Sequence, residues 1–116
     1  MPRDDLLPLS PLSMAILLAL ADRALHGYAL IQQIEAQTDG ALKPGTGSLY
    51  AGLQRLLGDG LIREVESDPD ADRRRRTFGI TPLGRELAEA EAHRMLRVLD
   101  VATEKEIIGE LRPVRS

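Results

Sequence analysis

The chain has 116 residues, of which 43% are hydrophobic and 28% are charged. This length fits one domain with one core, and the composition is that of a folded protein rather than a disordered one. The sequence contains no cysteine, which excludes disulfides, thiolate metal sites and a catalytic thiol. Aromatic residues make up only 3%, so we expect a core of aliphatic side chains, as in packed helices.

The net charge of −3 at pH 7 argues against a nucleic-acid partner, but the distribution of charge argues for one. Four of the fifteen basic residues are consecutive, from Arg73 to Arg76. The start of the chain lacks the pattern of a signal peptide, and the longest apolar run, residues 14–21, is much shorter than a membrane span. We therefore expect a cytoplasmic protein with no membrane partner.

Three short helices are predicted in the first half of the chain. Ser10-Pro11 combines a helix N-cap with proline at the first helical position, and apolar residues recur at helical spacing over about 11–23. A second amphipathic helix begins near Tyr28 and ends near 38–40, where glycine suits a C-terminal stop.

A turn over residues 42–48 precedes the third predicted helix. We expect Thr46 or Ser48 to cap this helix, because both side chains can accept a backbone N–H. Its apolar residues are leucines, and Gly58-Asp59-Gly60 is expected to end it.

The second half of the chain predicts a β-hairpin and a long helix. Residues 61–66 and 73–80 have the character of strands, and the segment between them holds a proline and three aspartates, as a turn requires. Thr81-Pro82 repeats the cap-and-proline signal. The last helix is expected from Leu83 to at least Ala102, with two alternatives left open: a break near Thr103 or continuation to Leu111.

The order of helix, helix, helix, hairpin and long helix predicts a fold that is mainly α with a small β-hairpin. This is the layout of a winged helix-turn-helix, in which the third helix enters the major groove of DNA. We expect a DNA-binding domain over 1–81 and a C-terminal dimerisation helix over 82–116.

Four motifs sharpen this prediction. They are His26-Gly27-Tyr28, Gly47-Ser48-Leu49-Tyr50, Leu53 and Leu56 with Asp59-Gly60-Leu61-Ile62, and Ile80-Thr81-Pro82-Leu83-Gly84-Arg85. In this order and spacing they resemble the PadR family of bacterial transcriptional regulators, in its short-tailed branch, over about residues 9–87. The resemblance implies a dimeric repressor whose third helix and wing contact operator DNA and whose last helix packs against its twin. Phe78 departs from the family pattern, which often has tyrosine in this strand.

The residues expected to contact DNA lie in the third helix, the turn before it and the wing: Lys43, Thr46, Ser48, Tyr50, Gln54, Arg73, Arg74, Arg75 and Arg76. Thr46 and Ser48 are helix caps, phosphate ligands or both, since a helix N-terminus attracts anions. Tyr50 is either a half-buried packing residue or a contact to phosphate or a base edge. Gln54 either presents its amide to adenine or is merely solvated.

A run of charge is usually a solvated surface, but on a wing it favours contact with DNA phosphates. Alternate residues of a strand face opposite sides, so Arg73 and Arg75 would share one face, and Arg74 and Arg76 the other. Three aspartates lie just upstream and are expected to neutralise part of the wing: Asp68, Asp70 and Asp72.

The last helix carries an apolar stripe that is wider than one small domain needs. Its residues are Leu87, Ala88, Ala92, Met95, Leu96, Leu99 and Ala102. One alternative is that the stripe packs against the first helix of the same chain. The other, with which that packing is compatible, is a homodimer interface, and the width of the stripe favours the homodimer.

Other functional classes find little support in the sequence. Gly45-Thr46-Gly47 lacks the third glycine of a dinucleotide-binding motif, because Tyr50 occupies that place. His26 and His93 are far apart and have no cysteine companions, so we expect no metal site. We expect no enzyme and no cofactor, and the sequence identifies no small-molecule effector. The alternative function is a winged helix that serves only protein interaction, which the acidic net charge permits.

Overall fold

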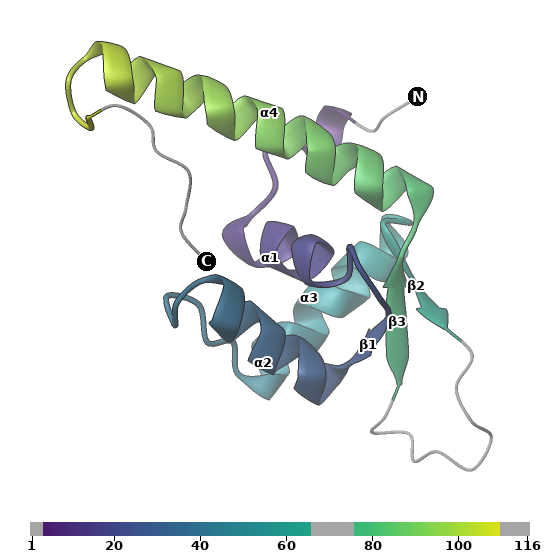
Figure 1. Cartoon of the computed structure of the whole chain (residues 1–116). Helices are drawn as coiled ribbons and strands as arrows, with labels where there is room; N and C mark the ends of the chain where they lie inside the picture. The colour runs from purple at the N-terminus through teal and green to yellow at the C-terminus, as the bar shows by residue number, and fades with distance from the viewer. Residues whose placement is uncertain (1–3, 66–75, 110–116) are drawn as a thin grey trace.

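The computed structural model describes residues 4–65 and 76–109. Its elements, in order, are a 3-10 helix η1 (Asp4–Leu6), α1 (Pro11–Ala19), β1 (Leu25–His26), α2 (Gly27–Gln37), α3 (Thr46–Gly58), β2 (Ile62–Val65), β3 (Thr77–Ile80) and α4 (Pro82–Glu104). In Figure 1, α4 is the longest element and crosses over the cluster formed by α1, α2 and α3, while the strands stand at the side of that cluster. This is the mainly helical fold with a small antiparallel sheet that the sequence predicts. The predicted turn and the start of the returning strand, 66–75, and the end of the chain from 110 lie outside the described residues.

Local sequence signals set the starts of α1 and α4. The hydroxyl oxygen of Ser10 accepts the backbone N–H of Ser13 at 3.0 Å, and that of Thr81 accepts the N–H of Gly84 at 3.0 Å. A proline follows each cap, at a position where a helix needs no N–H donor. Both helix starts confirm the predictions.

The start of α3 differs from the prediction. Its N-cap is Gly45, in an extended conformation, and within the described residues no side chain caps the first turn. Thr46 and Ser48 are already inside the helix, so their hydroxyls lie past the position from which a cap accepts an N–H. The prediction that either residue caps this helix is therefore wrong.

The sheet has three strands in the order β1-β3-β2, and both neighbouring pairs are antiparallel. The predicted hairpin pairing is present, with Glu64 opposite Phe78 in the register. The returning strand was predicted from residue 73, but among the described residues it begins at Thr77 and Arg76 lies just outside it. The third strand, β1, pairs Leu25 with Phe78 on the other side of β3 and was not predicted. His26 ends this strand and then caps α2, where its Nδ1 accepts the N–H of Ala29 at 3.4 Å.

The core is aliphatic, as predicted, with one aromatic residue at its centre. Phe78 has no exposed surface and is packed among leucines and isoleucines from α1, α2, α3 and the sheet. Six of the nine residues of α1 are buried, so this helix forms the centre of the molecule. The fully enclosed side chains besides Phe78 are Ile16, Leu17, Leu20, Leu30, Ile34, Leu49, Leu53, Leu56, Leu61 and Leu87.

Only the first half of α4 belongs to this core. Its buried residues are Gly84, Leu87 and Glu91, whereas the residues from Ala92 to Val101 are exposed. The helix ends at Glu104, and Glu106 has a positive φ of 61° that a helix does not allow. Of the two predicted alternatives, the break near Thr103 is confirmed.

Gly84 is required where the start of α4 packs against Leu61, in the turn between α3 and β2. A Cβ at this position would collide with the backbone carbonyl of Leu61, which also accepts the N–H of Thr81 at 3.1 Å. Since backbone atoms held in this way cannot move aside cheaply, Gly84→Ala should lower the free energy of unfolding by about 2 kcal/mol. Chemical denaturation measures this change.

Gly58→Ala is the matched control for Gly84→Ala. A Cβ at residue 58 meets no atom of the described residues within 4 Å. Alanine is the better helix former, so this variant should gain about 0.5–1 kcal/mol. A Gly84→Ala protein as stable as the parent would contradict the close packing of α4 on Leu61.

Glu91 is a buried carboxylate that ties the N-terminal segment to α4. It is 2% exposed, accepts the backbone N–H of Leu9 at 3.2 Å, and accepts two hydrogen bonds from Arg94, at 3.1 Å from Nε and 2.6 Å from Nη2. The bonds from Arg94 hold the pKa of Glu91 below its ordinary value of 4.5, against the opposing effect of burial. The ionised form is therefore the one that this site stabilises.

Glu91→Gln should reduce the sensitivity of the fold to acid. Because the folded-state pKa of Glu91 is depressed, its contribution to stability is present above the unfolded pKa and is lost as the pH falls through the folded value. The variant should be less stable than the parent near neutral pH, and the difference should shrink below about pH 4.5. Unfolding measured from pH 7 to pH 3 tests this, with the exposed Glu86→Gln as control. A constant difference across that range would contradict it.

Candidate nucleic-acid interface

The first turn of α3 is open to solvent. Residues 45–48 are exposed, and the first helical hydrogen bond runs from the N–H of Leu49 to the carbonyl of Gly45 at 2.9 Å. By helix geometry the earlier N–H groups have no partner within the helix, and they lie at its positive end. The hydroxyls of Thr46 and Ser48 lie on the same turn. Such a turn offers donors for a phosphate group.

Tyr50 joins this turn to the rest of the domain. Its side chain is half-buried, and a Cβ on Gly27 would collide with its hydroxyl, so the phenol packs against the start of α2. This packing supports the structural alternative for the ring, while contact of the hydroxyl with DNA stays a prediction. Gln54, one turn further along α3, is exposed.

Arg76 lies at the base of the wing, where it contacts Glu64 and Phe78. Its guanidinium donates two hydrogen bonds to the carboxylate of Glu64, and its Cζ lies 5.3 Å from the centroid of the Phe78 ring. The hydrogen bonds to Glu64 raise the pKa of Arg76, and the nearby Tyr50 adds a smaller part of the same shift. The other three predicted wing contacts, Arg73, Arg74 and Arg75, lie outside the described residues.

Lys43 is paired with an acid outside the recognition helix. Its Nζ lies 3.6 Å from a carboxylate oxygen of Glu35 on α2, and both side chains are largely exposed. An exposed pair of this kind contributes little to stability, so Lys43 stays available to a stronger anionic partner.

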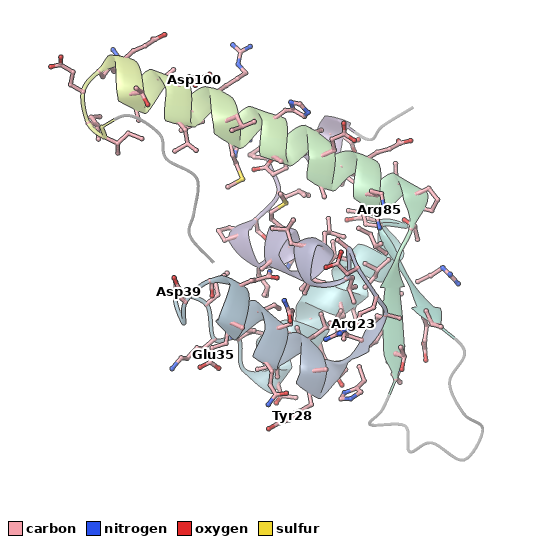
Figure 2. All side chains as sticks on the ribbon, viewed as in Figure 1. Arg23, Tyr28, Glu35, Asp39, Arg85 and Asp100 are labelled. Atoms are coloured by element: carbon pink, nitrogen blue, oxygen red, sulfur yellow. The ribbon has the colours of Figure 1, made fainter. Side chains whose placement is uncertain are left out.

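The structure therefore brings together some of the predicted residues and adds others. Thr46 and Ser48 share one turn, and Tyr50 adds a smaller part to the raised pKa of Arg76, although the direct contacts of Arg76 within the described residues are with Glu64 and Phe78. The sequence missed Glu64, because its contact with Arg76 depends on strand register. It also missed Tyr28, which is 68% exposed on the first turn of α2 and points away from the helices in Figure 2.

The outer half of α4 carries an exposed apolar face. Its members are Met95, Leu96, Val98, Leu99 and Val101, which are 38–54% exposed. The apolar surface continues onto α1, where Leu18 is 49% exposed. Between these helices and the end of α2 lies a hollow of about 510 Å³, lined among others by Leu18, Met95 and the Glu91–Arg94 pair.

The predicted interface residues of α4 thus separate into two groups. Leu87 is completely buried in the core of its own chain and Ala88 packs against that core, so the first alternative, packing within the chain, holds for these two. Leu87 has no surface left for a partner, and we remove it from the expected interface. Ala92, Met95, Leu96 and Leu99 are exposed, and Ala102 is half-buried.

Residues 4–65 and 76–109 contain neither a candidate membrane span nor a candidate metal centre. None of the helices there is long and apolar enough to cross a membrane. Within the same residues, no three side chains of the metal-binding types His, Cys, Asp and Glu come together in a group that suits a metal ion.

The fold is similar to several solved structures of transcriptional regulators. A PadR family transcription regulator from Clostridium difficile has a TM-score of 0.69 at 18% identity, with 82% of this chain and 97% of that one covered. A transcriptional regulator from Clostridium thermocellum has a TM-score of 0.67 at 23% identity, covering 80% and 87%. A PadR-like regulator from Bacillus cereus has 0.65 at 21%, covering 85% and 93%. At these identities the likeness concerns the fold.

Sequence comparison extends this likeness to a family. A curated relative, an uncharacterized 37.1 kDa protein in transposon TN4556 of Streptomyces fradiae, is 47% identical over 85 residues. The match covers 73% of this chain but only 23% of the relative, so the chain spans about a quarter of that protein's length. The sequence model of the PadR-like family matches residues 16–90, which is more than half of the chain. The chain therefore belongs to the PadR-like family of transcriptional regulators.

Proposed function

We propose that this protein is a DNA-binding transcriptional regulator that acts as a homodimeric repressor on an inverted-repeat operator. The observation that carries the proposal is the exposed first turn of α3, where the N–H groups before Leu49 have no partner within the helix and the hydroxyls of Thr46 and Ser48 lie on the same turn. In a winged helix this helix is the one that enters the major groove.

Each part of the surface has a different role in the proposal. The first turn of α3 holds a phosphate, which sets the register of the protein on the duplex. Gln54, exposed one turn further on, reads a base edge. Arg76 and the arginines before it bind phosphates along the neighbouring backbone. The phosphate contacts of the first turn of α3 and of the arginines give affinity, and only the base contact of Gln54 gives sequence preference.

Binding to duplex DNA tests the proposal directly. Fluorescence anisotropy with a labelled duplex of random sequence at low salt should show binding that weakens as salt is added, because phosphate contacts release counterions. Selection of bound fragments from genomic DNA should then enrich one inverted repeat. Absence of binding at low salt would reject the proposal and would favour the protein-interaction alternative, which the net charge of −3 permits.

Gln54→Ala should relax sequence preference without changing general affinity. If the amide makes a bidentate contact with adenine, the variant should lose about 1–3 kcal/mol of discrimination at one operator position. Binding to the operator and to its single-base variants measures this loss. Gln32→Ala, at another exposed glutamine on α2, is the control. Equal losses on operator and random DNA would mean that Gln54 does not read sequence.

The dimer is part of the same proposal. A single winged helix makes few base contacts, whereas two that are rigidly joined bind two half-sites at once. The exposed apolar face of α4 and the adjoining hollow support a second copy as the partner, because such a continuous apolar surface is uncommon on a monomer. An isologous dimer requires an inverted repeat with half-site centres about 10 bp apart, or a multiple of that.

A further inference from the structure

Glu64 and Arg76 form a bidentate ion pair at the base of the wing. Nε of Arg76 donates to Oε2 of Glu64 at 3.1 Å, and Nη2 donates to Oε1 at 2.7 Å. The two side chains remain 48% and 34% exposed, respectively. Solvent therefore reaches the pair.

The register of the sheet produces this contact. Glu64 lies opposite Phe78, and Arg76 precedes Phe78 by two residues, so the three side chains share one face of the sheet. Diagonal neighbours of this kind are within reach of long side chains. The guanidinium of Arg76 lies over the Phe78 ring in a cation–π contact, with Cζ 5.3 Å from the ring centroid. Arg76 is therefore held on this face of the sheet by Glu64 and Phe78.

The carboxylate of Glu64 occupies the donors that a phosphate would use. An arginine recognises carboxylates and phosphates with the same pairs of parallel N–H groups. While Glu64 is bound, two of the five donors of Arg76 are taken and its charge is neutralised locally. A phosphate that approaches this site meets an ion pair rather than a free cation.

The strength of the ion pair decides whether it mainly stabilises the fold or can exchange its carboxylate for a DNA phosphate. Both side chains are exposed, and exposed ion pairs add little to stability because water and salt screen them. The polyanionic backbone of DNA offers a competing acceptor at the same place. The pair is thus weak enough to open and still strong enough to reduce the affinity of Arg76 for a phosphate.

We propose that Glu64 is an internal competitor for the DNA backbone at Arg76, and that it lowers the affinity of the wing for every DNA sequence alike. This inference rests on the proposed function, because it requires that the wing meets DNA. The consequence is a lower affinity for random DNA, so that the base contacts of α3 make a larger relative contribution to binding at the operator.

Replacement of Glu64 by a neutral side chain tests the proposal. Glu64→Gln and Glu64→Ala should each bind a random duplex roughly twofold to fivefold more tightly than the parent at low salt. The slope of log K against log salt should steepen by up to about 0.9, which corresponds to one added phosphate contact. Glu104→Gln, at an exposed acid on the last turn of α4, changes the net charge equally and should leave both values unchanged.

A double-mutant cycle separates competition from general repulsion. In a chain that also carries Arg76→Ala, Glu64→Gln should lose most of its gain, because the donors that Glu64 blocks are no longer present. An equal gain with and without Arg76 would overturn the proposal, and so would a gain no larger than that of Glu104→Gln. If the parent binds no duplex at all, the proposed function fails instead. Unchanged thermal unfolding would confirm that the variants are folded.

Discussion

Leu99→Asp is expected to convert the proposed dimer into a monomer, with a dissociation constant at least about a hundredfold higher. Leu99 lies in the middle of the exposed apolar face of α4 and is 38% exposed in the single chain. A partner that covers this face would bury the new carboxylate without a counter-charge, which costs several kcal/mol. The core of the chain should be unaffected, because the last buried residue of α4 is Glu91, two turns earlier. Sedimentation velocity at micromolar concentration measures the change.

His93→Asp provides the matched control for this variant. It introduces the same charge on the same helix, but on the polar side, where the His93 side chain is 72% exposed next to Glu89. This protein should remain a dimer. The Leu99→Asp monomer should keep weak, salt-sensitive binding to random DNA and lose its preference for the operator, since it can occupy only one half-site. A parent that sediments as a monomer, or a monomeric variant with undiminished operator affinity, would contradict the proposed assembly.

The parts of the fold that the sequence could predict depend on local interactions. Ser10-Pro11 and Thr81-Pro82 define the starts of α1 and α4 because a cap and its acceptor lie within one turn. The predicted end of the first helix near residue 23 was too late, since α1 ends at Ala19. The apolar pattern continues through Leu20, but the residues after it turn to supply β1. A strand of two residues has no periodicity to detect, so β1 could only be found from its pairing with β3.

The site was less predictable because its contacts join distant segments. Glu64 and Arg76 meet through strand register, and the bond from Leu9 to Glu91 joins residues 82 positions apart. A glutamate in an amphipathic helix is ordinarily assigned to solvent, and nothing near Glu91 in sequence reveals that it is buried. The burial of individual residues in the apolar stripe of α4 was equally unpredictable from the sequence. Sequence alone cannot separate Leu87, which fills its own core, from Met95, which is 46% exposed.

Combined replacement of Arg74 and Arg76 by alanine is expected to weaken binding to all DNA sequences alike. Each phosphate contact that is lost should flatten the dependence of log K on log salt by roughly 0.9. Two full contacts would lower the slope by about 1.8, and the change should be smaller to the extent that Glu64 already occupies the donors of Arg76. Arg74 lies outside the described residues, and its role rests on the prediction that it shares a face with Arg76. Anisotropy titrations over a range of salt concentrations measure both effects.

Two comparisons make this last result specific to the wing. Arg97→Ala with Lys105→Ala removes the same charge from exposed positions of α4 and just beyond it. This variant should change the salt slope little, because the C-terminal end of α4 lies away from the strands in Figure 1. Alanine at Arg73 and Arg75 tests the opposite face of the predicted strand. If replacement of Arg74 and Arg76 lowers affinity and slope while replacement of Arg73 and Arg75 changes neither, one face of the wing contacts the DNA backbone. If affinity and slope are unchanged in both wing variants, the wing is not a DNA contact, and the recognition helix must supply the affinity without it.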